Sequence, residues 1–285
     1  MHNRGVKQLL KLKVLTENRA KKRGMLGEHG LSLLIETDSL KVLFDTGQTD
    51  VFSLNAEMDG VDLSMVDALI VSHGHYDHTG GVPEFCRINK KAAIYMHPDS
   101  FCERYNAVRG KPTGSCIGVP WSCENKELFK SRIVFVKEPV SIDENIMISG
   151  EIPVNAANPF TDFVKINISG AYEEDMVTDE QFMIVNGSKG IYVFVGCSHP
   201  GILSCIAYAK VLFPNTNICG VIGGMHLEKY NQDQLSQVAF GLKLAGVERI
   251  APMHCTGILS SCFLKSEFGE RCLLLNSGDE LILED

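Results

Sequence analysis

The chain has 285 residues, of which 45% are hydrophobic and 22% charged, a composition typical of a globular protein with a sizeable core. Its formal net charge of -8 argues against a general binder of nucleic acid or of membrane surfaces, because neutralising phosphates takes a basic face. No stretch of the sequence reaches the roughly 18–20 apolar residues of a membrane span. The N-terminal residues alternate charged and apolar types, unlike a secretory signal, so we expect a cytoplasmic protein.

Many short apolar runs, rich in β-branched residues, predict β-strands along the chain. They lie at 9–15, 30–37, 41–47, 67–72, 92–97, 132–136, 146–150, 181–185, 190–196, 217–224, 249–254 and 272–276. The segment "NGSKG" at 186–190 predicts a tight hairpin between two of these strands. The basic segment "NRAKKRG" at 18–24 is interpreted as a solvated loop, with an anion-guiding rim of a site as the alternative.

Four longer segments have helical periodicity, at 50–60, 201–213, 231–246 and 256–269. Asn231 is expected to cap the third helix and Gly246 to end it, whereas Thr256 is expected to cap the fourth. The order of strands and helices predicts a single α/β domain over residues 1–285, with sheets packed face to face and helices outside. Residues 98–130 have weak periodicity and hold the only tryptophan, so they are interpreted as an irregular insertion or lid loop that carries specificity.

The segment "VSHGHYDHTGG" at 71–81 places His73, His75, Asp77 and His78 within six positions. It follows a predicted buried strand and precedes a glycine-rich helix start, so it lies at the carboxyl end of a strand, where α/β sheets place their sites. His73 and His75 alternate and can point the same way. Imidazole and carboxylate ligands suit zinc, iron or manganese. The segment therefore predicts a metal site rather than a histidine-rich polar loop.

The letters "HGHYDH" match the HxHxDH motif, so the chain resembles the metallo-β-lactamase superfamily. The segments "GEHGLSLLIE", "LFDTGQ", "SHGHYDHTGG", "GCSHPGI" and "GGMHL" are similar to a branch of 7,8-dihydropterin-6-yl-methyl-4-(β-D-ribofuranosyl)aminobenzene-5'-phosphate synthase-like proteins. The superfamily resemblance implies a four-layer αββα sandwich with one or two divalent metal ions at its edge. It also implies that Asp45 of "FDTG" braces the metal loop. The branch implies a pterin-like or folate-like substrate.

The resemblance also implies ligands from later strand ends. His199 and His254 are the expected imidazole ligands, and Cys197 occupies the place of the usual bridging aspartate, with a buried neutral thiol as the alternative. The usual "GHT"-type histidine is missing. The open alternatives for further contributions to the site are His97, Glu151, His226, and the pair Glu28 and His29 at the site edge.

A bound metal ion with an open position lowers the pKa of water to about 7, which favours hydrolysis of an ester, lactone, thioester or phosphate-linked small molecule. Asp77 is expected to orient the water or carry its proton, and His226 or Thr256 to hold an anionic group of the substrate. Zinc is the expected metal, with iron or manganese as alternatives. A synthase reaction on a pterin-like precursor is the narrower option. Nothing in the sequence specifies an oligomeric state.

Two other classes of function remain open on the sequence. The first is an iron-binding redox or electron-transfer protein, because the chain has ten cysteines. However, no CxxC pair occurs, so an iron–sulfur cluster would need ligands from distant segments such as Cys102, Cys116 and Cys123 or Cys255, Cys262 and Cys272. Buried, reduced cysteines are the alternative. The second class is a binding or sensor module that has lost turnover.

Overall fold

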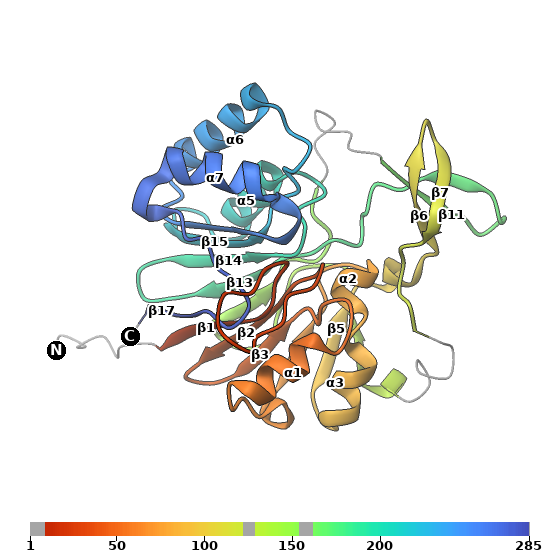
Figure 1. Cartoon of the computed structure of the whole chain (residues 1–285), viewed down its shortest axis with the longest axis horizontal. Helices are drawn as coiled ribbons and strands as arrows, with labels where there is room; N and C mark the ends of the chain where they lie inside the picture. The colour runs from red at the N-terminus through yellow and green to blue at the C-terminus, as the bar shows by residue number, and fades with distance from the viewer. Residues whose placement is uncertain (1–8, 122–128, 154–161, 285) are drawn as a thin grey trace.

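The computed structural model describes residues 9–121, 129–153 and 162–284. Within these ranges the strands form three sheets (Figure 1). The first has the order β17 (Glu280–Glu284), β1 (Leu10–Thr16), β2 (Ser32–Thr37), β3 (Lys41–Phe44), β4 (Ala68–Ile70), β5 (Ala93–Met96), β8 (Ile133–Phe135). The second has the order β16 (Ile250–Met253), β15 (Ile218–Gly224), β14 (Ile191–Val195), β13 (Met183–Asn186), β10 (Ile146–Ile148), β9 (Val140–Ser141). The third has the order β12 (Tyr172–Glu174), β11 (Phe163–Ile166), β6 (Arg104–Val108), β7 (Lys111–Cys116).

Helices flank the first two sheets on their outer sides (Figure 1). The helices are α1 (Val51–Met58), α2 (Tyr76–Thr79), α3 (Val82–Ile88), α5 (Ile202–Leu212), α6 (Gln232–Leu244) and α7 (Ile258–Phe268). Short 3₁₀ helices are η1 (Leu63–Met65), η2 (Pro98–Phe101), η3 (Lys130–Arg132), η4 (His254–Thr256) and η5 (Gly269–Arg271). None of the helices in the described ranges has both the length and the apolar character needed to cross a bilayer.

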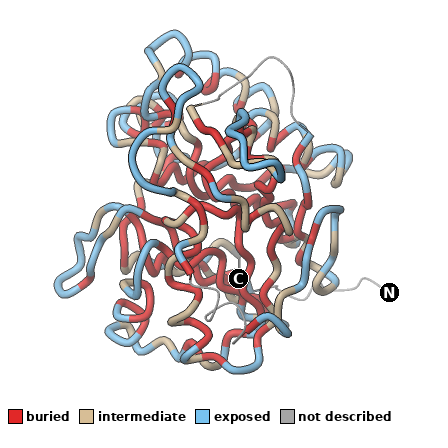
Figure 2. Tube along the Cα trace, turned by 90° about the vertical axis from the view of Figure 1, so that its right-hand side faces the viewer, coloured by how far each residue is buried: buried red, intermediate tan, exposed pale blue. Residues whose placement is uncertain are grey.

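Three separate hydrophobic cores account for the layers. The central core joins the two large sheets, for example Phe44 with Phe194, whereas one outer core packs α1 and α3 on the first sheet and the other packs α5, α6 and α7 on the second. Strand β14 alternates between cores: Val193 belongs to the helix side and Phe194 to the central one. In Figure 2 the buried residues, coloured red, run through the interior of the molecule, and the exposed ones, in pale blue, lie toward its periphery. The predicted four-layer αββα architecture is therefore confirmed.

Phe194→Ala is expected to destabilise the protein by about 3–5 kcal/mol, because it leaves a large cavity in the central core. Phe194 is 0% exposed, whereas Phe240 on α6 is 67% exposed, so Phe240→Ala is the matched control and is expected to change stability by less than about 0.5 kcal/mol. Denaturant unfolding of the two variants measures the difference. Equal unfolding midpoints would contradict the assignment of Phe194 to the core.

Most of the predicted elements form, and the exceptions have local causes. Helix α6 begins with the predicted Asn231 cap, a reciprocal capping box with Gln234. The prediction that Thr256 caps helix α7 is wrong. Gly257, at φ 76°, occupies the N-cap position, and Thr256 belongs to the preceding 3₁₀ turn. The strand predicted at 272–276 is also wrong, because Cys272 makes only an isolated bridge to Ile250.

The segment predicted as an irregular insertion at 98–130 is more regular than expected. Strands β6 and β7 form an antiparallel hairpin that pairs through β6 with β11. This third sheet projects beside the sandwich (Figure 1). Short polar strands such as "KPTGSC" lack the alternation by which a strand is recognised, which is why the sequence did not predict them. Residues 122–128 of the segment lie outside the described ranges.

Candidate metal centre

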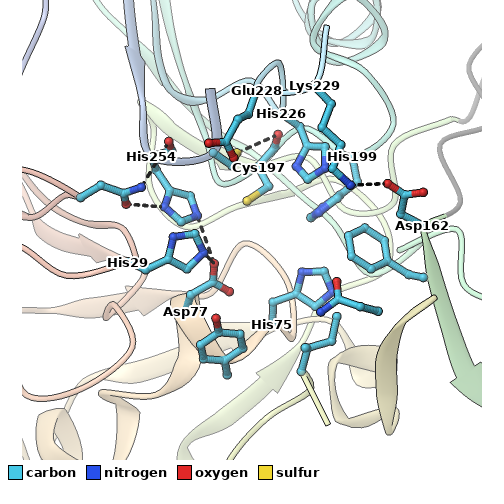
Figure 3. Close-up of a pocket in the computed structure, with 16 residues that line it drawn as sticks. His29, His75, Asp77, Asp162, Cys197, His199, His226, Glu228, Lys229 and His254 are labelled. Carbon is cyan, nitrogen blue, oxygen red and sulfur yellow. Dashed lines mark hydrogen bonds and ion pairs between the residues drawn. The ribbon is translucent and has the colours of Figure 1, made fainter. Parts of the chain in front are cut away.

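The candidate metal residues meet at one edge of the sandwich, where strands from both large sheets end. His73 and His75 follow β4 of the first sheet. Cys197 and His199 follow β14 of the second sheet, and His254 directly follows β16. Among the described residues, four groups of side chains could each hold a metal ion, because the ligand atoms within a group all lie within 4.8 Å of one another. The groups are His73–Cys197–His199, His78–Cys197–His254, Cys197–His226–Cys255 and His29–Asp77–His254. Figure 3 shows several of these side chains pointing toward one another.

Each of four histidines has its Nδ1 atom beside a polar partner. His78 Nδ1 lies 2.7 Å from Asp45, and His199 Nδ1 lies 2.6 Å from Glu180. His254 Nδ1 lies 2.9 Å from Asn18 Oδ1. His73 Nδ1 lies 2.9 Å from the hydroxyl of Ser72, which itself donates to Asp45. Such partners place the ring proton on Nδ1, so the lone pair of each Nε2 faces the interior of the cluster.

The inward-facing atoms of the cluster are electron-pair donors that lie close to one another. The Nε2 atoms of His78 and His254 are 3.3 Å apart, and Cys197 Sγ lies 3.2 Å from His78 Nε2. His254 Nε2 also lies 3.1 Å from a carboxylate oxygen of Asp77. His75 Nε2 is buried and has no hydrogen-bond partner among the described residues. Donor atoms this close repel one another unless a cation lies between them, so the residues present fit the divalent ions that the motif implies.

The electrostatics of the cluster also favour a cation. Burial, together with the neighbouring imidazoles, holds the pKa values of His73 and His75 well below the usual range, which keeps both rings neutral as metal ligation requires. Burial alone would raise the pKa of Asp77, but His78 and His254 hold it well below its usual range. Against burial, the carboxylates of Asp45 and Asp77 raise the pKa of His78 to about 9. The same negative charges attract a metal ion, which would displace that proton.

Two adjacent acidic residues that the sequence analysis did not identify support the metal loops. The Glu180 carboxylate accepts hydrogen bonds from the backbone N–H groups of Cys197, Ser198 and His199 and from His199 Nδ1. Asp179 accepts a hydrogen bond of 2.7 Å from the Gly74 N–H, between the two histidines of the motif. Both carboxylates are 1% exposed or less as side chains. The sequence "TDEQF" around them is a polar turn, which carries no signal of burial.

The third sheet is attached to the metal loop through buried contacts. Arg104 on β6 forms ion pairs with Asp179 at 2.9 Å and with Asp175 at 3.2 Å. The Tyr76 N–H donates to the carbonyl of Ile117, just beyond β7. The Trp121 indole N–H donates to the carbonyl of Thr79 at the end of α2. The insertion is therefore positioned by the same loop that carries the HxHxDH motif.

A cavity of about 280 Å³ opens over the cluster. Its lining residues come from the N-terminal loops, the metal loops and the third sheet: Asn18, His29, His75, Tyr76, Asp77, Asn106, Ile117, Asp162, Phe163, Cys197, His199, His226, Glu228, Lys229, His254 and Cys255. Lys229 and Asp162 form an ion pair of 2.6 Å across the lining, visible in Figure 3. The cavity thus places an aromatic ring, Phe163, and a lysine ammonium group close to the candidate metal ligands.

Several of the alternatives left open by the sequence are placed by the structure. His97 and Glu151 pair with each other at 2.9 Å and belong to none of the four ligand groups. Glu28 accepts hydrogen bonds from Gln48 and Thr49. The Thr256 hydroxyl is fully buried and accepts the Met225 N–H, so it does not line the cavity as a substrate contact would.

Two other early candidates lie at the cavity. His29 lies 3.1 Å from Asp77, and His226 belongs to the lining. In the basic segment 18–24, Asn18 supports His254, whereas Lys22 pairs with Asp59, away from the cavity lining.

The cysteines do not form the four-thiolate cluster of the redox alternative within the described ranges. The ligand groups there contain only Cys197 and Cys255. Cys262, although near Cys255 in sequence, is exposed on α7. Cys123 lies outside the described residues. The iron–sulfur hypothesis therefore has no support from this part of the chain.

Comparison with known proteins agrees with the geometry. Residues 26–135 match the family model of the metallo-beta-lactamase superfamily. The chain is 34% identical to the uncharacterized protein MJ0448 of Methanocaldococcus jannaschii over 254 residues, which cover 86% of this chain and 90% of that protein. It is 29% identical to the 7,8-dihydropterin-6-methyl-4-(beta-D-ribofuranosyl)-aminobenzene-5'-phosphate synthase of the same organism over 263 residues, 88% of each chain.

A solved structure resembles the whole fold. Tm1679, described as a metal-dependent hydrolase of the beta-lactamase superfamily, superposes with a TM-score of 0.83 at 30% identity, covering 97% of this chain and 100% of that one. The shared motif region, the αββα layers and the cluster of histidines at the sheet edge all agree with this similarity. The chain belongs to the metallo-β-lactamase superfamily.

Proposed function

We propose that the protein is a metal-dependent hydrolase that acts on a small anionic substrate, of a pterin-like or folate-like class. The observation that carries the proposal is the convergence of four donor atoms: Cys197 Sγ lies 3.2 Å from His78 Nε2, His78 Nε2 lies 3.3 Å from His254 Nε2, and His254 Nε2 lies 3.1 Å from Asp77. These residues would hold a divalent ion, which would supply hydroxide at neutral pH because metal coordination lowers the pKa of water to about 7. We expect zinc, with iron or manganese as alternatives.

The residues of the cavity support distinct roles in such a reaction. The Asp77 carboxylate lies 3.1 Å from the Nε2 atoms of both His29 and His254, so it can orient a water at the cavity floor and pass that water's proton on toward His29. Its position next to half-exposed His29 gives that proton a path to solvent. The Lys229 ammonium group, 70% exposed, can attract an anionic group of the substrate while its partner Asp162 orients it.

The aromatic residues of the cavity support a planar substrate. Phe163 lies 5.1 Å from the ring of His75 and 5.4 Å from that of His199, between centroids. Its ring therefore borders the cavity beside the candidate ligands, where the flat face of a heterocycle can stack. The relative named as the synthase of a dihydropterin compound is similar over 88% of this chain, which favours the same chemical class here.

Reconstitution of metal-free protein tests the proposal. Zinc or manganese is expected to restore hydrolysis in a panel of phosphate esters, phosphodiesters, lactones and thioesters, with pterin phosphates included. Asp77→Asn is expected to reduce the rate by about 10²–10⁴-fold, because the carboxylate that moves the proton is lost. The matched control is Asp67→Asn, an exposed aspartate at the other end of β4. Metal binding without turnover across the panel would instead identify a binding or sensor module.

A synthase reaction is the second candidate. The observation that favours it is the similarity to the synthase of Methanocaldococcus jannaschii. Joining a pterin phosphate to an aromatic amine forms a C–N bond and breaks the C–O bond to the phosphate, which departs as an anion while the amine gives up a proton; Lys229 and an ion held by the same ligands could stabilise that anion. Product analysis with a pterin phosphate, in the presence and absence of an arylamine, separates the two: hydrolysis gives the pterin alcohol alone, whereas synthesis gives the coupled amine.

A further inference from the structure

Three neighbouring parallel strands each end in a residue that can ligate a soft metal. Cys197 follows β14, His226 follows β15 and Cys255 follows β16. The strands pair in parallel, with Val195 opposite Gly223 and Gly224 opposite Met253, so their carboxyl ends are level. The three side chains therefore reach the same edge of the second sheet from adjacent positions.

The ligand atoms of these residues form a compact group. The two Sγ atoms and one ring nitrogen of His226 all lie within 4.8 Å of one another, and all three residues line the cavity. Cys255 Sγ lies 3.6 Å from the carbonyl of Cys197. A Cβ atom at Gly224 would lie 2.6 Å from Cys255 Sγ, so the glycine leaves the space that this sulfur occupies.

The backbone around the group is strained in a way that aims these side chains. His226 has φ 50°, and residues next to the two cysteines, Ser198 and His254, have φ 62° and φ 49°. Non-glycine residues rarely adopt this region, and such strain concentrates at functional sites. At Ser198 the strain is held by hydrogen bonds from its N–H to Glu180 and from its hydroxyl to the Gly224 carbonyl.

We propose that Cys197, His226 and Cys255 form a further metal position, of the Cys₂His type, that binds a thiophilic divalent ion such as zinc. Three protein ligands with a fourth position open to the cavity are the arrangement of a catalytic rather than a structural zinc site. Two thiolates make this position softer than the imidazole-rich groups around His73 and His78, so it selects ions differently from them. Cys197 belongs to both environments and its sulfur can bridge them. The position goes beyond the proposed hydrolysis, and its existence does not depend on it.

Cobalt(II) tests the position, because thiolate ligation gives a charge-transfer band in the near ultraviolet that imidazole ligation lacks. Metal-free protein, kept reduced and anaerobic, is titrated with Co²⁺ while the band and the bound cobalt are measured. We expect Cys255→Ser to lose one equivalent of cobalt and part of the band. Cys262→Ser, which changes an exposed cysteine on α7, is the matched control and is expected to match the unchanged protein in both.

The second variant, His226→Gln, should lose the same equivalent of cobalt while both thiols remain. An unchanged band and stoichiometry in Cys255→Ser and His226→Gln would overturn the proposal, because the band would then come from Cys197 in the imidazole-rich groups and Cys255 would bind no ion. The hydrolytic assay on the unchanged protein is read separately. If the unchanged protein shows no hydrolysis but both variants lose the band, only the proposed hydrolysis is contradicted. If the unchanged protein hydrolyses a substrate but neither variant loses the band, only the Cys₂His position is contradicted.

Discussion

His75→Ala is expected to remove most of the bound metal and the activity while the domain stays folded. The imidazole is buried at the base of the cavity, and its Nε2 atom has no hydrogen-bond partner within the described ranges. Complete zinc sites bind with about 10–16 kcal/mol, so the loss of one ligand should cost roughly 3 kcal/mol, about a hundredfold in Kd. The variant removes an unsatisfied buried nitrogen but also the 3.0 Å hydrogen bond between His75 Nδ1 and His73 Nε2, so the metal-free variant should unfold close to the temperature of the metal-free parent.

The matched control for this variant is His97→Ala. His97 is also fully buried and follows the adjacent strand β5, but its Nε2 atom pairs with Glu151 and it does not line the cavity as His75 does. Elemental analysis after dialysis, together with thermal unfolding, measures both variants, and His73→Ala is expected to behave as His75→Ala does. Full metal stoichiometry in both motif variants would refute the assignment of the motif as a metal site.

Glu180→Ala is expected to have the largest effect on stability of any single change at the site. Its carboxylate is the acceptor for four donors, the N–H groups of Cys197, Ser198 and His199 and the His199 ring. Each buried donor left without an acceptor costs about 1–3 kcal/mol, so the sum approaches the whole stability of a typical domain, about 5–15 kcal/mol. We expect the protein to unfold or to lose the loop at 197–199 altogether.

Glu180→Gln separates support of the metal from folding. The amide keeps the shape and one acceptor oxygen but presents an NH₂ group to part of the donor set, so we expect a folded protein with metal affinity reduced about 10–100-fold. Glu174→Gln, on the exposed strand β12, is the matched control. Competition with a chelator of known affinity measures the loss. Unchanged affinity in Glu180→Gln would show that the carboxylate has only a folding role.

The sequence predicts the part of the site in which several metal-ligand residues lie close together along the chain. His73, His75, Asp77 and His78 stand out because four metal-ligand side chains share six positions, and Asp45 follows from the family motif. His199, His226 and His254 could be placed because each follows a recognisable buried strand. The structure brings these residues to one sheet edge.

The supporting residues could not be predicted, because nothing local marks them as buried. Asp179 and Glu180 lie in a turn, and Glu17 and Asn18 lie far along the chain from His254, whose N–H and ring they contact. An acidic or amide residue in a loop is usually solvated, so only the fold reveals that these are enclosed.

The sequence predicts the fold where the hydrophobic periodicity is clear. It does not predict segments whose conformation depends on tertiary contacts instead. Helices α1, α5 and α6 were found within a few residues of their ends. The run at 272–276 is apolar because Leu275 packs in the central core, not because it forms a ladder. The third sheet escaped prediction since β6 and β7 are short and largely polar, and its fixed position comes from buried Arg104.

The cluster draws its donor atoms from both large sheets, and this has a mechanical consequence. His73 to His78 are carried by the N-terminal sheet, whereas Cys197, His199 and His254 are carried by the C-terminal one. An ion held between them is a reversible cross-link that opposes separation of the sheets. At a free concentration a hundred times its Kd, such an ion adds about 2.7 kcal/mol to the folded state. Metal supply in the cell would therefore govern how long the molecule survives proteolysis.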